Sequence, residues 1–261
     1  MDRGEPAQIW YFPVLCASFV LCNIFIVLRS LIWKSVTNKV FQGNNNKAQA
    51  CISKIFFYGF VSIYGYFVLN YEPWSKDTNQ YHLTFGPETY PLKIYFYYIV
   101  EFSFYLTEFL YLLSSYDSKD RYQLIIHHIV TISLITLSFC KDYARVGIVV
   151  MGLHDVADPF LECSKLLVYM NNTLYANIGF AMFTAVFILS RIFFYPYWIL
   201  YPTYQYLKKA YTLDAFLCAC CLFILYILHW YWTFMILKTF RNIFVKKEYK
   251  DARSKSVIND K

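Results

Sequence analysis

The feature that most constrains the fold is the recurrence of apolar runs long enough to cross a lipid bilayer. Runs of about 18 or more residues match the roughly 30 Å hydrocarbon core when they form helices. Such runs recur along the whole 261-residue chain, and short connectors take up nearly all the rest. The composition, 58% hydrophobic and 16% charged, is unlike that of a soluble globular protein. The sequence therefore predicts an all-α integral membrane protein with about seven transmembrane helices.

Seven apolar runs are expected to span the membrane as helices. In chain order they are residues 9–32, 55–71, 92–113, 122–140, 146–170, 176–200 and 213–237. The first run is long for the apolar core of a signal peptide and is interpreted as a retained span. Lys and Arg are in excess in the connector after the first run and in the C-terminal tail, but not in the N-terminus or the second connector. The positive-inside rule therefore predicts a lumenal N-terminus and a cytosolic C-terminus.

The formal net charge of +7 comes largely from these connectors and the tail. Topology explains this charge better than nucleic-acid binding, for which no recognition fold has room, so no nucleic-acid partner is expected. Most of the eight cysteines lie in or at the ends of predicted spans. They are expected to be free, buried thiols rather than a disulfide framework.

Two of the apolar runs contain clusters of ionisable or histidine side chains that would lie at membrane depth. The run at 122–140 contains the adjacent residues His127 and His128. The run at 146–170 contains His154, Asp155, Asp158, Glu162 and Lys165. Ionisable groups are costly within a bilayer, and where they occur they usually mark a functional site. These seven residues, called the polar seam below, are therefore the predicted functional site.

Helical spacing places residues of the polar seam on common faces. Thr131 follows the two adjacent histidines by four and three residues, so its hydroxyl can contact either ring. Between His154 and Lys165 the polar residues follow the spacing i, i+4, i+8 and i+11, which predicts one continuous polar stripe. A short turn at residues 141–145 makes the two runs antiparallel neighbours. Their polar faces are expected to line a shared interior pocket.

The chemistry of such a pocket suits acyl transfer. A histidine beside a carboxylate is held in one tautomer and is stabilised as imidazolium, which makes it a competent general base or acyl acceptor. His127 or His128 could deprotonate an attacking amine or alcohol, or accept an acyl group itself. Asp155 and Asp158 would orient those rings and support them electrostatically.

Other ionisable residues leave more than one interpretation open. Glu101, Arg191 and His229 fit intramembrane ion pairs or hydrogen bonds between helices as well as substrate contacts. His82, in a polar connector, is expected to be solvated. A metal is the main rival within the polar seam, because histidines and carboxylates can bind iron or zinc. Five histidines in the whole chain are too few for the histidine clusters of membrane di-iron oxygenases, so no metal is expected.

The polar seam and its surroundings resemble the ceramide synthases, the sphingoid-base N-acyltransferases of the TLC-domain family. The resemblance covers about residues 52–242. Its motifs are Glu101-Phe-Ser-Phe-Tyr105, Gln123-Leu-Ile-Ile-His127-His128-Ile-Val-Thr131, Gly147, Leu153-His154-Asp155-Val-Ala-Asp158-Pro-Phe-Leu161-Glu162-Cys-Ser-Lys165, Arg191-Ile-Phe-Phe-Tyr-Pro196-Tyr-Trp198 and Leu228-His229-Trp-Tyr-Trp. The double histidine together with the H-D-x-x-D-x-x-L-E-x-x-K pattern is the specific part of this match.

The resemblance implies that six of the seven helices form a TLC-type bundle around a polar cavity. It divides the chain into residues 1–51, with the first span and a short cytosolic connector, a TLC domain at 52–242, and a basic cytosolic tail at 243–261. The implied reaction joins a fatty acyl group from acyl-CoA to the amine of sphinganine or sphingosine, giving (dihydro)ceramide and CoA in the endoplasmic reticulum membrane. Acyl-CoA is a co-substrate, and no cofactor is implied. Membrane lipid is a further expected partner, and homo- or hetero-dimers are compatible with the family.

The resemblance also assigns roles to individual residues. The implied catalytic positions are His127, His128, His154, Asp155 and Asp158. The implied substrate-binding or supporting positions are Glu101, Thr131, Glu162, Lys165, Arg191 and His229. Whether one of the paired histidines carries an acyl group, or attack is direct, is left open. Residues 201–211 correspond to the lumenal loop tied to acyl-chain preference in the family.

Two features depart from the family. The connector after the first span is too short for the homeobox-like segment of many animal members, and the tail is basic where some members have an acidic, phosphorylatable one. Regulation of those members is therefore not expected here. The alternative functions are a TLC-type lipid sensor or transporter, which should lack the double histidine, and a seven-span receptor, which does not fit the polar seam.

Overall fold

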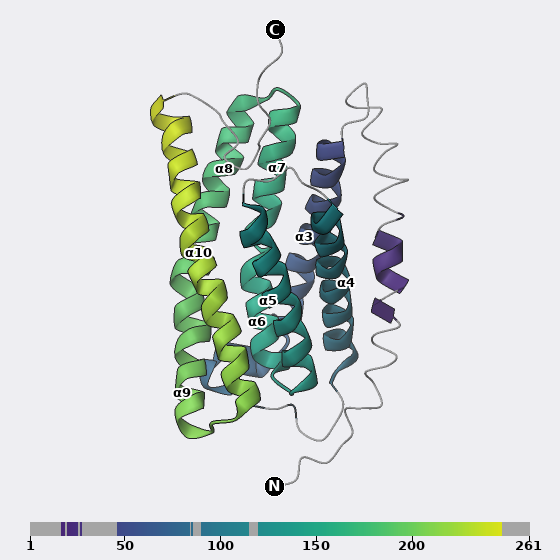
Figure 1. The fold of residues 1–261 in the computed structure, drawn as a ribbon, viewed down its shortest axis with the longest axis vertical. Coiled ribbons are helices and arrows are strands. Elements are labelled where there is room, and N and C mark those ends of the chain that lie inside the picture. The colour runs from purple at the N-terminus through teal and green to yellow at the C-terminus, as the bar shows by residue number, and fades with distance from the viewer. Residues whose placement is uncertain are drawn as a thin grey trace.

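The computed structural model describes residues 17–18, 20–25, 27, 46–83, 85, 90–114 and 120–246, and the regular structure within them is entirely helical. The elements are α3 (Asn46–Asn70), the 3-10 turns η2 (Pro73–Lys76) and η3 (Thr78–Gln80), α4 (Leu92–Ser114), α5 (Arg121–Cys140), α6 (Ala144–Asp155), α7 (Asp158–Tyr169), α8 (Thr173–Phe187), the π-helices η4 (Ile188–Phe194) and η5 (Pro196–Leu200), α9 (Tyr201–Lys209) and α10 (Leu213–Lys246). Figure 1 shows the long helices side by side, with the α7–α8 turn and the end of α10 at the upper end and α9 at the lower end. The predicted all-helical class is confirmed.

Four helical stretches of the described chain are long and apolar enough to cross a membrane. They are Lys47–Asn70, Arg121–Cys140, Thr173–Lys209 and Leu213–Phe244, with mean hydropathies of 1.5 to 2.0. This result supports a multi-pass membrane protein. The run predicted at 92–113 is helical as α4 but is not among the four. The count of seven spans therefore stays a prediction.

The first predicted run, residues 9–32, lies largely outside the described residues. Its described part is helical and lies against α4. The Ser103 hydroxyl donates to the carbonyl of Ser18 at 3.1 Å, and the Thr107 hydroxyl donates to the Cys22 sulfur at 3.0 Å. The cysteines within the described residues are all free, as predicted.

The fifth predicted run is divided into two consecutive helices, which corrects the expectation of one uninterrupted helix. Pro159 lacks an amide hydrogen, and its ring conflicts with the carbonyl four residues earlier, that of Asp155. Helix α6 accordingly ends at Asp155, and α7 begins at Asp158 with the proline in its first turn. The seam residues of this run are therefore distributed over the end of α6 and the length of α7.

The predicted connector at 201–211 is mostly helical, which corrects the boundary of the sixth run. Helix α9 continues directly from α8, η4 and η5, so that Thr173–Lys209 forms one helical stretch. Pro196 and Pro202 lack amide hydrogens, and the wider π-helical turns accommodate the missing bonds. Helix α10 likewise continues past the predicted end at 237, to Lys246.

Two tight turns depend on left-handed backbone conformations. Asp142 has a φ of 60° between α5 and α6, and Asn171 has a φ of 57° between α7 and α8. Asp and Asn tolerate this conformation because their short polar side chains form local hydrogen bonds. At the second turn the Asn172 amide donates to the Leu167 carbonyl at 2.9 Å, which closes the end of α7.

Helix α5 packs mainly on α4 and α10, whereas α7 packs mainly on α8 and α3. The two parts of the polar seam therefore lie mainly on helices with different neighbours. Helix α6, which carries His154 and Asp155, contacts both α5 and α3 and so connects the two parts.

Candidate functional site

A polar cavity of about 430 Å³ lies among the helices of the bundle. Seven residues that the sequence predicts for the site line it, namely His127, His128, His154, Asp158, Glu162, Lys165 and Arg191. They come from α5, α6, α7 and η4, and residues of α3, α4, α8 and α10 complete the wall. The predicted shared pocket thus exists, but several helices form it rather than two runs alone.

The adjacent histidines on α5 lie between an aromatic side chain of α4 and one of α10. The rings of His127 and His128 are 5.6 Å apart, measured between centroids. Tyr105 of α4 lies 6.4 Å from His127 and 6.0 Å from His128, and Trp232 of α10 lies 5.2 Å from His127. Aromatic packing on two sides restricts the orientation of the pair at the cavity wall.

His154 is held by hydrogen bonds at both ring nitrogens. Its Nδ1 lies 2.7 Å from the carbonyl of Val150, which can only accept, so Nδ1 carries the proton. Its Nε2 lies 2.8 Å from Nε2 of His229 and therefore accepts that N–H. The arrangement joins α6 to α10 across the bundle, and it gives His229 the helix-to-helix hydrogen bond that was one of its two interpretations.

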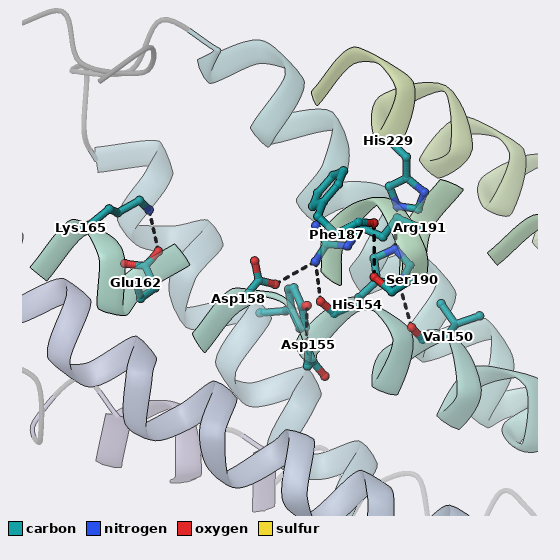
Figure 2. Close-up of polar contacts among 11 residues, drawn as sticks. Val150, His154, Asp155, Asp158, Glu162, Lys165, Phe187, Ser190, Arg191 and His229 are labelled. Atoms are coloured by element: carbon teal, nitrogen blue, oxygen red, sulfur yellow. Dashed lines mark hydrogen bonds and ion pairs between the residues drawn. The ribbon is translucent and has the colours of Figure 1, made fainter. Parts of the chain in front are cut away.

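Arg191 closes the break between α6 and α7. Its guanidinium forms an ion pair with Asp158 at 2.9 Å and donates to the carbonyl of His154 (Figure 2). That carbonyl lies in the last turn of α6, where carbonyl groups have no backbone N–H of the same helix to accept from. The guanidinium also lies 4.5 Å from the ring of Phe187, in cation–π geometry. For Arg191 the structure therefore realises the ion-pair interpretation, at the cavity wall.

Two Lys–Glu pairs lie at another part of the wall. Lys165 and Glu162 of α7 are 2.6 Å apart (Figure 2), and Lys54 of α3 lies 2.6 Å from Glu108 of α4. These acidic and basic side chains partly balance one another, so the wall offers both hydrogen-bond donors and acceptors. Local spacing predicts the first pair, but it does not indicate that Lys54 reaches α4.

Asp155, which was expected beside the histidine rings, does not line the cavity. It is fully buried, and its Oδ1 accepts a hydrogen bond from the Tyr105 hydroxyl at 3.2 Å. Since the same tyrosine ring contacts both histidines, Asp155 reaches the pair through Tyr105. Glu101 is also fully buried and faces Asp155 rather than the cavity.

A second, apolar pocket of about 50 Å³ meets the polar cavity at Tyr105 and His154, which line both. Thr131 lines this pocket, not the polar cavity. At the other end, His82 is 9% exposed and forms a 3.2 Å hydrogen bond with Thr203, so the expectation of a solvated histidine is wrong. Burial lowers the pKa of His82 to about 4.

Several residues that line the polar cavity were assigned no role from the sequence, among them Lys54, Tyr58, Tyr105 and Trp232. Glu108 was noticeable only because it follows Glu101 by seven residues and so shares its helical face. Tyr105 and Trp232 stand in motifs that carry the resemblance, but no role follows for them from local pattern, because a chain with 22% aromatic residues offers many equivalent ones.

Comparisons with known proteins identify the family of the chain. A model of the TLC domain matches residues 47–238. Human ceramide synthase 3 is 33% identical over 237 residues, which cover 89% of this chain and 61% of that protein. The ceramide synthase hyl-1 of Caenorhabditis elegans is 29% identical over 250 residues, covering 88% and 67%. Mouse ceramide synthase 5 is 31% identical over 204 residues, covering 76% and 49%.

The chain thus spans about 61% of the length of the human relative. The domain match covers most of the chain, including every residue that lines the polar cavity. The chain therefore belongs to the TLC-domain family, and the similar proteins named above are ceramide synthases.

Proposed function

We propose that this chain is an N-acyltransferase that joins the acyl group of a fatty acyl-CoA to the amine of a sphingoid base, giving (dihydro)ceramide and CoA. The observation that carries the proposal is the pair His127 and His128 on the wall of a polar cavity inside an apolar bundle. Ceramide synthase names among the similar proteins supply the substrate class.

The reaction requires one imidazole that can exchange a proton or an acyl group at the cavity. In direct attack, the amine nitrogen forms a C–N bond as the thioester C–S bond breaks. Its proton passes to the imidazole and then to the CoA thiolate. In the covalent route, an imidazole nitrogen bonds to the acyl carbon as the C–S bond breaks and the CoA thiolate leaves. The amine then displaces the imidazole from the acyl carbon, and the proton that the amine loses is balanced by the one that the thiolate takes up. Both nitrogens of His154 are occupied by structural hydrogen bonds, so His127 and His128 are the better candidates for either route.

The two cavities suit the two parts of the substrates. The polar cavity can receive the amine and the thioester, because its wall contains both charged hydrogen-bond donors and charged acceptors. The apolar pocket begins at Tyr105 and His154, and its surface is mostly apolar, so at about 50 Å³ it suits a short part of a hydrocarbon chain. Each buried methylene group contributes about 0.8 kcal/mol to binding.

The proposed location is the endoplasmic reticulum membrane, with the C-terminus in the cytosol. His127 and His128 lie six and seven residues into α5, ~10 Å along its axis from Arg121. Cytosolic acyl-CoA could reach this depth while the sphingoid base enters from the membrane. No nucleic acid, metal or further cofactor enters the proposed reaction.

The test is an acceptor survey with the purified chain in lipid nanodiscs. Long-chain acyl-CoA is supplied with sphinganine, with a lysophospholipid or with monoacylglycerol, and products are identified by mass spectrometry. The proposal expects N-acylated sphinganine as the main product. An Ile129→Ala variant serves as control, since Ile129 is 50% exposed on the same helix. Acylation of an alcohol acceptor in preference to sphinganine, or lipid binding without any acylated product, would refute the proposal.

A further inference from the structure

A pair of acidic side chains lies in the interior between α4 and α6, outside both cavities. Glu101 and Asp155 are each 0% exposed, and their carboxyl groups face one another. Within the described part of the chain, the ion pairs formed by Lys and Arg go instead to Glu72, Glu108, Asp158 and Glu162. Two facing carboxylates without a cation repel one another and have lost their hydration, so this geometry disfavours a doubly ionised pair.

The hydrogen bonds of the pair indicate which member holds a proton. If both groups were ionised, both oxygens of Glu101 and the Oδ2 of Asp155 would be buried acceptors without a donor. One proton between them supplies that donor. Asp155 already accepts from the Tyr105 hydroxyl at 3.2 Å, which stabilises its charged form, whereas none of the described residues donates in this way to Glu101. The proton therefore belongs on Glu101.

We propose that Glu101 is a protonated positioning residue that donates to Asp155 and thereby fixes Tyr105 behind the histidine pair. The links run from Glu101 to Asp155, from Asp155 to the Tyr105 hydroxyl, and from the tyrosine ring to His127 and His128 at 6.4 and 6.0 Å. Because Tyr105 lines both cavities, its position affects the place where they meet.

Other titratable groups face the pair from each neighbouring element, and none replaces the proposed proton. They are Tyr97 from α4, Tyr58 from α3, Asp158 from α7 and Arg191 from η4. The guanidinium of Arg191 is directed to Asp158 and to the His154 carbonyl (Figure 2). Among the described residues, its ion pair is with Asp158 and not with Asp155. Glu101 itself touches neither cavity, so it acts through Asp155 and not on the substrates.

Activity provides the first test, and this readout alone rests on the proposed N-acyltransferase function. The amide of Glu101→Gln can donate to Asp155 as the protonated carboxyl does, so activity within about twofold of wild type is expected. Glu101→Ala removes the donor, and a loss of about tenfold is expected, as for a lost buried hydrogen bond. A Glu101→Gln chain with wild-type thermal stability but more than tenfold lower activity would overturn the proposal, because it would show a need for charge.

The second test does not depend on activity. The infrared carbonyl stretch of a protonated carboxyl is separate from that of a carboxylate, and it is measured at neutral pH on the purified full chain. The band should be present in wild type, absent in Glu101→Gln, and retained in Glu108→Gln, whose carboxylate on the same helix pairs with Lys54. A wild-type chain without the band, or a band that persists in Glu101→Gln, overturns the inference whatever reaction the protein catalyses.

Discussion

Replacement of Arg191 is expected to destabilise the fold more than any other single change at the cavity wall. The side chain is 9% exposed and that of Asp158 is 18% exposed. Removing one member of a buried ion pair costs about 3–5 kcal/mol, and the partial exposure of Asp158 favours the lower end of this range. The lost bond to the His154 carbonyl adds about 1–3 kcal/mol. Arg191→Ala should therefore lower the free energy of unfolding by about 4–6 kcal/mol.

A double-mutant cycle isolates the ion pair from the rest of this loss. Arg191→Ala, Asp158→Asn and the double variant are unfolded reversibly in mixed micelles, and the coupling energy is taken from the four free energies. We expect a coupling of at least about 1.5 kcal/mol, whereas neutral hydrogen bonds between membrane helices average only about 0.6 kcal/mol. The more exposed pair of Lys93 and Glu72 is the control, with about 0–1 kcal/mol expected. A coupling at Arg191 no larger than that control would refute the reasoning.

Three further predictions follow from local geometry. A methyl group at Gly147 would overlap the Tyr98 hydroxyl, so Gly147→Ala should cost about 1–3 kcal/mol in thermal unfolding, whereas Gly152→Ala on the same helix, with its nearest neighbour at 3.6 Å, should be neutral or stabilising; equal effects would contradict this. Tyr105→Phe should reduce acyl transfer about tenfold through loss of its bond to Asp155, and unchanged activity would exclude that role. Because the pKa of His82 is about 4 when folded and about 6.5 when unfolded, the unfolded state binds more protons between these values. Stability should thus fall as pH drops from 6.5 to 4, and His82→Gln should flatten this slope; an unchanged slope would count against the burial of His82.

The sequence predicts the features that depend on local periodicity. The helices α4 and α5 begin and end within one residue of the predicted runs, because apolar length is the dominant signal in a membrane protein. The residues of α7 that face the cavity follow from helical spacing, since Glu162 and Lys165 are three apart. Their meeting with His127 and His128 also follows, because polar groups in a bilayer avoid lipid.

The features that the sequence does not predict are long-range or depend on one special residue. His154 and His229 are 75 positions apart, and no local pattern pairs them. Tyr105 and Asp155 are 50 positions apart, and one tyrosine among 26 gives no signal of its hydrogen bond. The break before α7 was foreseeable from Pro159, but apolar length outweighed it in the prediction. The helical continuation through α9 is less accessible, because π-helical turns accommodate prolines that usually end a helix.

The most direct test of the central claim is a single-turnover measurement with the purified chain, sphinganine and labelled acyl-CoA. Wild type should form the amide and release free CoA thiol in equal amounts. The His127→Ala, His128→Ala double variant should lose about 10²–10⁴-fold in rate, which corresponds to about 3–5 kcal/mol in the activation barrier. Ile129→Ala should react as wild type does. Amide formation by a folded double variant at the wild-type rate would contradict the account.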